Sequence, residues 1–220
     1  MRSALAAGLA LALSTPIAAQ VKDSTNSATL EARSAYFDRG FMLHNTRAAI
    51  MALQARRAAG TSEQGAHLTY VHAPSGIVAL IPAIEAGKEF DEESTLLVGY
   101  RLNMLFEPWL HRNELYLHIR AKRATIFAEQ ELGPGGGVHI GIARTDTISY
   151  GPIYADWKGG IADNYLFQEK NISAFYAQAN IAVPLLRRKH FLLSVTSSTQ
   201  AVFGKKSRND FAGGVRATYR

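Results

Sequence analysis

The sequence predicts an all-β fold, an antiparallel meander closed into a barrel of about 8–12 strands or arranged as a barrel-like sandwich. Three observations predict it. Apolar and polar residues alternate with a period of two, turn-forming residues separate the alternating segments, and no segment after residue 19 is an unbroken apolar run of helical length. A period of two places alternate side chains on opposite faces of a strand, which a helix does not do.

The clearest alternation covers residues 94–122. The apolar positions are Leu96, Val98, Tyr100, Leu102 and Met104 in the first segment, and Leu115, Leu117, Ile119 and Ala121 in the second. The positions between them include Arg101, His118, Arg120 and Lys122. We therefore expect each strand to have a dry face and a wet face, and the four charged or imidazole side chains to share the wet environment.

Similar segments follow to the end of the chain. Alternation is clear in 138–143, 175–185, 191–203 and 211–219, and shorter candidates are 30–37, 66–73, 76–84, 125–132 and 147–154. Expected turns are 74–76, 85–88, 133–137, 158–160 and 204–206, because each is rich in Gly, Pro, Lys or Ser. Residues 46–59 are Ala-rich and suit a helix as well as a strand, so their state is left open.

Residues 1–19 predict a secretory signal peptide. Arg2 precedes an apolar stretch at residues 4–13, and the small residues Ala18 and Ala19 follow Pro16. Cleavage after Ala19 would make Gln20 the first mature residue, and an uncleaved membrane anchor is the alternative. We expect a polar, flexible arm at 20–27 and a single β-barrel-like domain at 28–220 of an exported protein in the Gram-negative envelope, at the outer membrane or a periplasmic membrane face.

Charge and composition narrow the expected partners. The formal net charge is +6 and cysteine is absent, so no disulfide partner is expected, and an exported chain seldom meets nucleic acid. Two basic turns and two tryptophans near strand ends are candidate docking residues: Arg187, Arg188, Lys189, Lys205, Lys206, Arg208, Trp109 and Trp157. They are interpreted either as solvated turns and ordinary packing, or as contacts to membrane lipid or a membrane protein complex.

No sequence pattern predicts a chemical site. A Gly-x-Ser-x-Gly elbow is absent, and thiol catalysis needs a cysteine that the chain lacks. The seven histidines are interpreted as scattered surface residues, the acidic run 88–93 as a solvated turn and the glycines of 133–137 as a hairpin loop. The sequence therefore predicts no catalytic residue, metal site or cofactor, and no enzyme.

One segment carries a resemblance to a family. Residues 34–41, Ser-Ala-Tyr-Phe-Asp-Arg-Gly-Phe, resemble the opening strand of uncharacterised Gram-negative outer-membrane β-barrel proteins, which begin with Tyr-x-x-Arg-Gly. Gln54, residues 93–96 and the strand 211–219 look like later parts of that family. The resemblance implies an antiparallel barrel and no known catalytic or ligand residue. Two departures bear on membrane insertion: Arg220 follows the terminal aromatic Tyr219, and the second segment lacks the family's usual proline.

Three hypotheses about function remain. The first is an outer-membrane barrel with a structural or small-solute role, whose dry faces meet lipid and whose wet faces line the lumen. The second is a membrane-extrinsic periplasmic accessory subunit that docks on and stabilises a larger membrane complex, such as a photosynthetic reaction-centre–light-harvesting assembly. The third is a periplasmic lipid or ligand binder shaped like a lipocalin.

Overall fold

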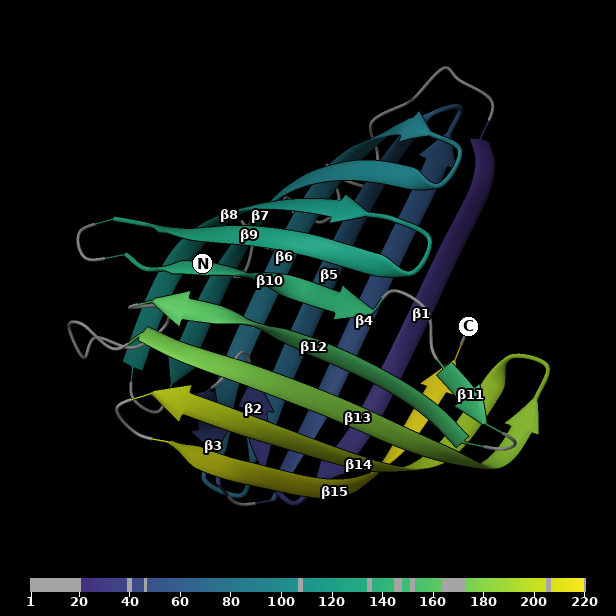
Figure 1. The fold of residues 1–220 in the computed structure, drawn as a ribbon. Helices are drawn as coiled ribbons and strands as arrows, with labels where there is room; N and C mark the ends of the chain where they lie inside the picture. The colour runs from purple at the N-terminus through teal and green to yellow at the C-terminus, as the bar shows by residue number, and fades with distance from the viewer. Residues whose placement is uncertain are drawn as a thin grey trace.

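The computed structural model describes residues 21–38, 41–45, 47–106, 109–133, 136–144, 148–150, 153–163, 173–204 and 207–219. These residues form a closed antiparallel barrel of 12 strands (Figure 1). The expected fold class is confirmed, as a barrel. Among the described residues there are no helices, and hence none long and apolar enough to cross a membrane.

Each barrel strand pairs with a neighbour on both sides. The barrel strands are β1 Val21–Arg33, β4 Ala48–Ala59, β5 Ser62–Ala73, β6 Gly76–Asp91, β7 Ser94–Phe106, β8 Trp109–Arg120, β9 Ala124–Leu132, β10 Val138–Arg144, β12 Ile153–Asp163, β13 Ser173–Arg188, β14 Phe191–Gly204 and β15 Arg208–Tyr219. Pairing of β10 with β12 and of β1 with β15 completes the circle. The short strand β11 Ile148–Tyr150 also pairs with β12.

The two ends of the barrel differ. At the end where β1 begins and β15 finishes, here called the terminal end, the turns at 60–61, 92–93, 121–123 and 189–190 are short and the connection 145–152 is longer. At the opposite end, called the hairpin end, the turns at 74–75 and 107–108 are short, but the two longest connections, 34–47 and 164–172, both lie there. This asymmetry bears on how the barrel would sit in a membrane.

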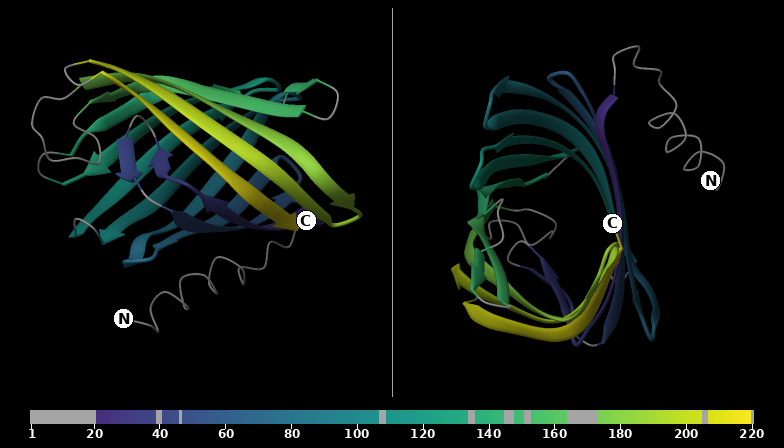
Figure 2. Two further views of the ribbon diagram at one scale, coloured as in Figure 1. Left: turned by 90° about the horizontal axis from the view of Figure 1, so that it is seen from below. Right: turned by 90° about the vertical axis from the view of Figure 1, so that its right-hand side faces the viewer.

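The connection from β1 to β4 contains a separate hairpin, β2 Tyr36–Asp38 and β3 Phe41–His44. Figure 2 shows this hairpin inside the ring of strands. The Phe37 side chain is 1% exposed and packs with Ala35 and with Ala212 of β15. The amide of Ser34 donates a hydrogen bond to the carbonyl of Gly213 (2.9 Å), so the hairpin is attached to the barrel wall.

The alternation predicted from the sequence separates the outside of the barrel from the inside. Val98 and Leu117 are 52% and 43% exposed, whereas their neighbours Leu97 and Tyr116 are 1% and 3% exposed. The apolar faces therefore point outward and the polar faces point into the lumen, so the dry faces are not an ordinary core.

The structure corrects two local expectations and decides one that was left open. The segment expected as a flexible arm is the first half of β1, and its backbone pairs with β4 from Val21↔Ala59 onward. The open segment 46–59 forms strand β4 from Ala48. The barrel opens with β1, not with residues 34–41; Tyr36 begins the internal hairpin, and Arg39 and Gly40 lie outside the described residues.

Two glycine-containing segments expected as turns lie inside strands. Residues 85–88 belong to β6 and 158–160 to β12. A Cβ built on Gly87 would overlap the Leu97 side chain, and one on Gly160 would overlap the Ile140 carbonyl. These glycines allow close packing between neighbouring strands, which a sequence pattern does not distinguish from a turn.

Candidate functional site

The main candidate site is the lumen, and its charged groups gather on the wall formed by β4–β10. This charged wall presents Arg56, Glu63, His67, Glu85, Arg101, Glu114, His118, Arg120, Glu129, Glu131 and His139. Each is placed by the inward half of a period-two strand. Glu114, Glu129, Glu131 and His139 are buried and the others are half-buried, so ion pairs and hydrogen bonds within the set compensate most of the charges.

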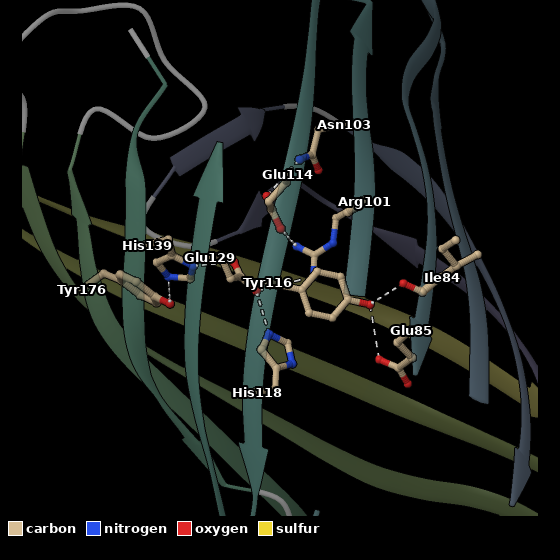
Figure 3. A network of polar contacts seen from close by, with 10 residues as sticks. All are labelled: Ile84, Glu85, Arg101, Asn103, Glu114, Tyr116, His118, Glu129, His139 and Tyr176. Atoms are coloured by element: carbon tan, nitrogen blue, oxygen red, sulfur yellow. Dashed lines mark hydrogen bonds and ion pairs between the residues drawn. The ribbon is translucent and has the colours of Figure 1, made fainter. Parts of the chain in front are cut away.

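Arg101 of β7 lies at the centre of the charged wall (Figure 3). Its guanidinium forms ion pairs with Glu114 on β8 (3.0 Å) and with Glu129 on β9 (3.4 Å). It also lies 4.9 Å from the centre of the Tyr116 ring, within the range of a cation–π contact. Asn103 donates a hydrogen bond to Glu114 (3.0 Å). One cation thus holds two carboxylates from two further strands.

Glu129 continues the network to a buried histidine. One oxygen lies 3.1 Å from the His118 ring, and the other lies 2.7 Å from Nδ1 of His139. Nε2 of His139 lies 2.7 Å from the Tyr176 hydroxyl on β13. Carboxylate, imidazole and phenol therefore form a continuous hydrogen-bonded chain (Figure 3), an arrangement that can move a proton between its ends.

The Tyr116 ring lies flat across the backbone of the neighbouring strand at Gly99. A Cβ built on Gly99 would overlap the ring. The Tyr116 hydroxyl reaches β6, where it donates to the Ile84 carbonyl (3.4 Å) and to Glu85 (3.3 Å). The glycine is therefore needed for the tyrosine to bridge three strands.

Glu85 and Glu63 anchor the part of the charged wall nearer the terminal end. Glu85 lies 2.9 Å from the His67 ring nitrogen Nε2 and 3.4 Å from the Arg56 guanidinium. Glu63 pairs with Arg56 (3.4 Å) and with Arg120 (3.1 Å). These pairs connect β4, β5, β6 and β8 across the inside of the barrel.

The opposite wall, formed by β13–β15 and β1, is mostly neutral and polar. Its inward side chains include Gln178, Asn180, Ser194, Thr196, Ser198 and Gln200. Thr196 donates a hydrogen bond to Glu31 (2.7 Å), which also forms ion pairs with Arg33 and Arg216. We call this surface the neutral wall, because hydroxyl and amide groups outnumber its charges.

A third part of the interior is apolar. Ala48, Ile50, Val71, Ala73, Val78, Ala79 and Leu105 form one buried cluster, with Ile81 and Leu110 packed against it. The cluster occupies the hairpin-end halves of β4–β7, so the inward side chains there are apolar rather than polar. Together with the internal hairpin, this cluster fills part of the cross-section at that end.

The predicted docking residues do not form one site. Arg187, Arg188 and Lys189 are exposed at the terminal end, where Arg187 donates to the Tyr154 hydroxyl (3.4 Å). This turn borders a cavity of about 340 Å³ at the lumen mouth that also includes Asp156 and Arg216.

The other predicted residues are dispersed. Lys205 and Lys206 lie outside the described residues, and Arg208 begins β15 at the hairpin end. Trp109, 64% exposed, lies at the hairpin end and packs edge-on against Phe106, while Trp157 lies within β12 on the outer surface.

Other sequence expectations need correction. Lys122, expected in the lumen, is exposed in a turn at the terminal end and pairs with Glu93 (2.6 Å). His118 and His139 are not surface residues without carboxylates, since both contact Glu129. The register of the β9–β10 hairpin, which was overlooked in the sequence, places Glu129 directly opposite His139. Within the described ranges, no group of three or more His, Asp or Glu is arranged to hold a metal ion.

Comparison with known proteins identifies related folds only. No protein-family model and no curated protein matches the chain. A KdgM porin solved in complex with disordered oligogalacturonate has a TM-score of 0.50 and 12% identity, over 90% of this chain and 99% of the porin. Outer membrane phospholipase A from Escherichia coli has a TM-score of 0.50 and 12% identity, over 94% and 93%.

A third structure comes from work on the in-meso crystallization of membrane proteins, with a TM-score of 0.54 and 11% identity over 88% of this chain and 83% of that one. At such identities the likeness shows the fold alone. The phospholipase corrects one expectation: the absence of enzyme motifs does not make a chain of this fold a non-enzyme, since a named enzyme shares the architecture.

Proposed function

We propose that this chain is an outer-membrane β-barrel that passes small hydrophilic solutes through its lumen. The observation that carries the proposal is the inverted polarity of the barrel. Large apolar side chains are exposed on the outside, while charged and amide side chains such as Glu114 and Gln200 are fully buried inside. Such an arrangement is unfavourable in water and favourable in a bilayer.

The outer surface has the composition of a lipid-facing belt. Its exposed apolar residues include Leu30, Leu53, Ile84, Val98, Leu115, Leu117, Ile126, Ile140, Ile161, Ile181, Val195 and Val215. Exposed aromatic residues lie near both ends of the strands: Phe175, Phe203, Phe211 and Trp109 at the hairpin end, and Phe90, Phe191 and Tyr219 at the terminal end. Aromatic residues at two levels around an apolar band are typical of transmembrane barrels.

The lengths of the connections support one orientation. Transmembrane barrels have short periplasmic turns and longer extracellular loops. The short turns at 60–61, 92–93 and 189–190 would then face the periplasm, together with both ends of the barrel domain. The internal hairpin would enter the lumen from the outside of the cell.

The lumen supports passage of small polar solutes rather than apolar ones. The charged wall carries three arginines and five glutamates, a net charge of −2 with its histidines neutral (3 − 5), so ion pairs offset most of its field and the remainder disfavours anions. Hydroxyl and amide groups on the neutral wall, such as Ser198 and Gln200, are 2% and 0% exposed in the closed packing. They would meet a solute only when the interior opens, and would then offer hydrogen bonds that replace those of water. The internal hairpin and the apolar cluster restrict the hairpin end and would limit solute size.

The test combines fractionation with solute flux. The full chain, produced in a Gram-negative host, is expected to remain with outer membranes through high-salt and carbonate washes. Purified protein in liposomes should cause swelling that is fastest with monosaccharides and falls steeply with oligosaccharide length. Release by the washes would contradict membrane insertion, and retention without swelling would contradict solute passage.

A matched pair of variants locates the route. Ser198→Trp places a large ring in the lumen, and Val195→Trp places the same ring on the outside of the same strand, where 43% of Val195 is exposed. Swelling should fall severalfold for Ser198→Trp and remain unchanged for Val195→Trp. Equal rates in both variants would show that solutes do not cross through the lumen.

A further inference from the structure

We propose that a groove on the outer surface at the terminal end binds an anionic phospholipid, with its phosphate at the turn 187–190 and an acyl chain along the alanines of β1, β4 and β5. The inference rests on the proposed membrane location and names the lipid that this surface would select. It does not depend on solute passage. Its test uses purified protein in detergent, where lipid binding and solute flux are measured separately.

The groove has a volume of about 600 Å³ and an apolar floor. Ala55 of β4 and Ala66 of β5 are directly opposite each other, and Ala28 of β1, which lies opposite Leu53, adds a third small side chain in the next row. Leu53, Leu68 and Tyr219 rise beside them. Because the neighbouring outward positions are large and the floor positions are alanine, the surface is hollowed where an acyl chain can lie.

A step in the barrel wall closes the groove at the terminal end. Pairing between β1 and β15 stops at Ala28↔Tyr219, whereas β1 continues beside β4 down to Val21↔Ala59. Along this stretch β15 supplies no partner, and Asn26 and Ser27 line the groove. The polar residues Asn26 and Ser27 therefore border the apolar floor. The groove thus offers a polar edge beside an apolar surface, as the headgroup of a lipid adjoins its acyl chain.

The turn beside this step is cationic. His190 lines the groove, and its ring lies 6.1 Å from that of Tyr219. Arg188 and Lys189 precede it, are exposed, and line the adjoining cavity at the lumen mouth, which shares His190 with the groove. Arg187 is directed to the Tyr154 hydroxyl at the lumen mouth, so it is the least available of the three cations for the groove. A phosphate at His190, where the groove and the cavity meet, would lie beside the turn that carries Arg188 and Lys189.

Charge complementarity selects the occupant. In a symmetric contact centred on the groove, a second copy of this chain would place its own cationic turn 187–190 against this one. A zwitterionic phospholipid fits the floor but gains little from two exposed cations. An anionic phospholipid satisfies both halves of the site, because each Lys or Arg near an anionic headgroup contributes to binding and the acyl chain covers the alanines.

The experiment is native mass spectrometry of the full, delipidated protein titrated with phosphatidylglycerol or phosphatidylethanolamine of identical acyl chains. Wild-type protein should bind the anionic lipid at least about tenfold more tightly. Arg188→Gln with Lys189→Gln should reduce that preference by about tenfold, because each charge contributes about 1 kcal/mol and 1.4 kcal/mol is a factor of ten. Ala55→Leu with Ala66→Leu should weaken both lipids alike.

Two control variants match these changes. Lys122→Gln with Arg123→Gln removes two cations from another turn at the terminal end, and Ala177→Leu with Ala201→Leu fills another cross-strand pair of alanines on β13 and β14. Both should bind lipid as the wild type does. Equal affinity of the wild type for the two lipids would overturn the proposal, as would equal losses in test and control variants. Correct membrane fractionation with no lipid preference would leave the proposed function standing and remove only the groove.

Discussion

The two walls of the lumen differ in how their buried polar side chains are paired. On the charged wall, Arg101 and Glu129 each contact partners on more than one strand, so the loss of one group leaves others buried without compensation. On the neutral wall, Thr196 donates a hydrogen bond to Glu31, which keeps Arg33 and Arg216 as partners when that bond is lost. The difference indicates that the charged wall is the more sensitive of the two to a single substitution, and the neutral wall is the one along which the proposed solute route would run.

The largest expected effect comes from the centre of the charged wall. Arg101→Met removes the cation from Glu114 and Glu129, and we expect the free energy of unfolding to fall by about 3–5 kcal/mol, since breaking a buried pair leaves uncompensated charge. Urea unfolding in detergent micelles measures this change. Lys122→Met, which breaks an exposed pair, should cost less than about 1 kcal/mol. Equal losses would remove the distinction between lumen and surface pairs.

A smaller loss is expected at Gly99. In Gly99→Ala the new methyl group displaces the Tyr116 ring and its contact with Glu85, at a cost of about 1–3 kcal/mol by overpacking. The double variant Gly99→Ala with Tyr116→Ala measures the coupling between the two positions. We expect the alanine at position 99 to cost much less once the ring is absent. An unchanged cost would show that the ring does not require the glycine.

Tyr176→Phe addresses the link between the two walls. The change removes the hydroxyl at Nε2 of His139, and the expected loss is about 1–1.5 kcal/mol, because one buried hydrogen bond disappears while Glu129 still holds Nδ1. The same urea titration measures it. A change near zero would mean that the chain of hydrogen bonds ends at His139.

The smallest change in stability is expected on the neutral wall. Thr196→Val keeps the shape of the side chain, and Glu31 retains Arg33 and Arg216, so the expected loss is less than about 1 kcal/mol. Swelling rates of liposomes should nevertheless fall, since the proposed route would expose a methyl group in place of the hydroxyl of Thr196, a residue that is 4% exposed in the closed packing. If Thr196→Val leaves the swelling rate unchanged, the neutral wall is not the surface that solutes contact.

The sequence predicted features set by neighbouring residues better than features set by residues far apart in the chain. The alternation at Leu96–Leu97–Val98 predicted both strand and face, because one residue's direction fixes its neighbour's. The glycines of 158–160 misled the prediction because a glycine that admits a close strand resembles one that makes a turn. The segment at 20–27 looked like an arm because its polar side chains concealed the backbone pairing of β1 with β4.

The site could be predicted from the sequence less well than the fold. Glu129 and His139 are cross-strand partners, a relation that depends on the register of one hairpin and could be sought in the sequence once that hairpin is recognised. The contact between His139 and Tyr176 crosses β12 and joins residues 37 apart in sequence. Only the closure of the barrel brings these strands together, so no local pattern indicates it.

The internal hairpin also constrains the order of folding. The strands that complete the circle, β1 and β15, come from opposite ends of the chain, and the bond between Gly213 and Ser34 joins residues 179 apart in sequence. Contacts at such separation form late, because a long loop must be closed first. The hairpin follows β1 directly and lies inside the finished ring. Its contacts with Ala212 and Gly213 need β15 in place, so the hairpin docks with the closure of the barrel or after it.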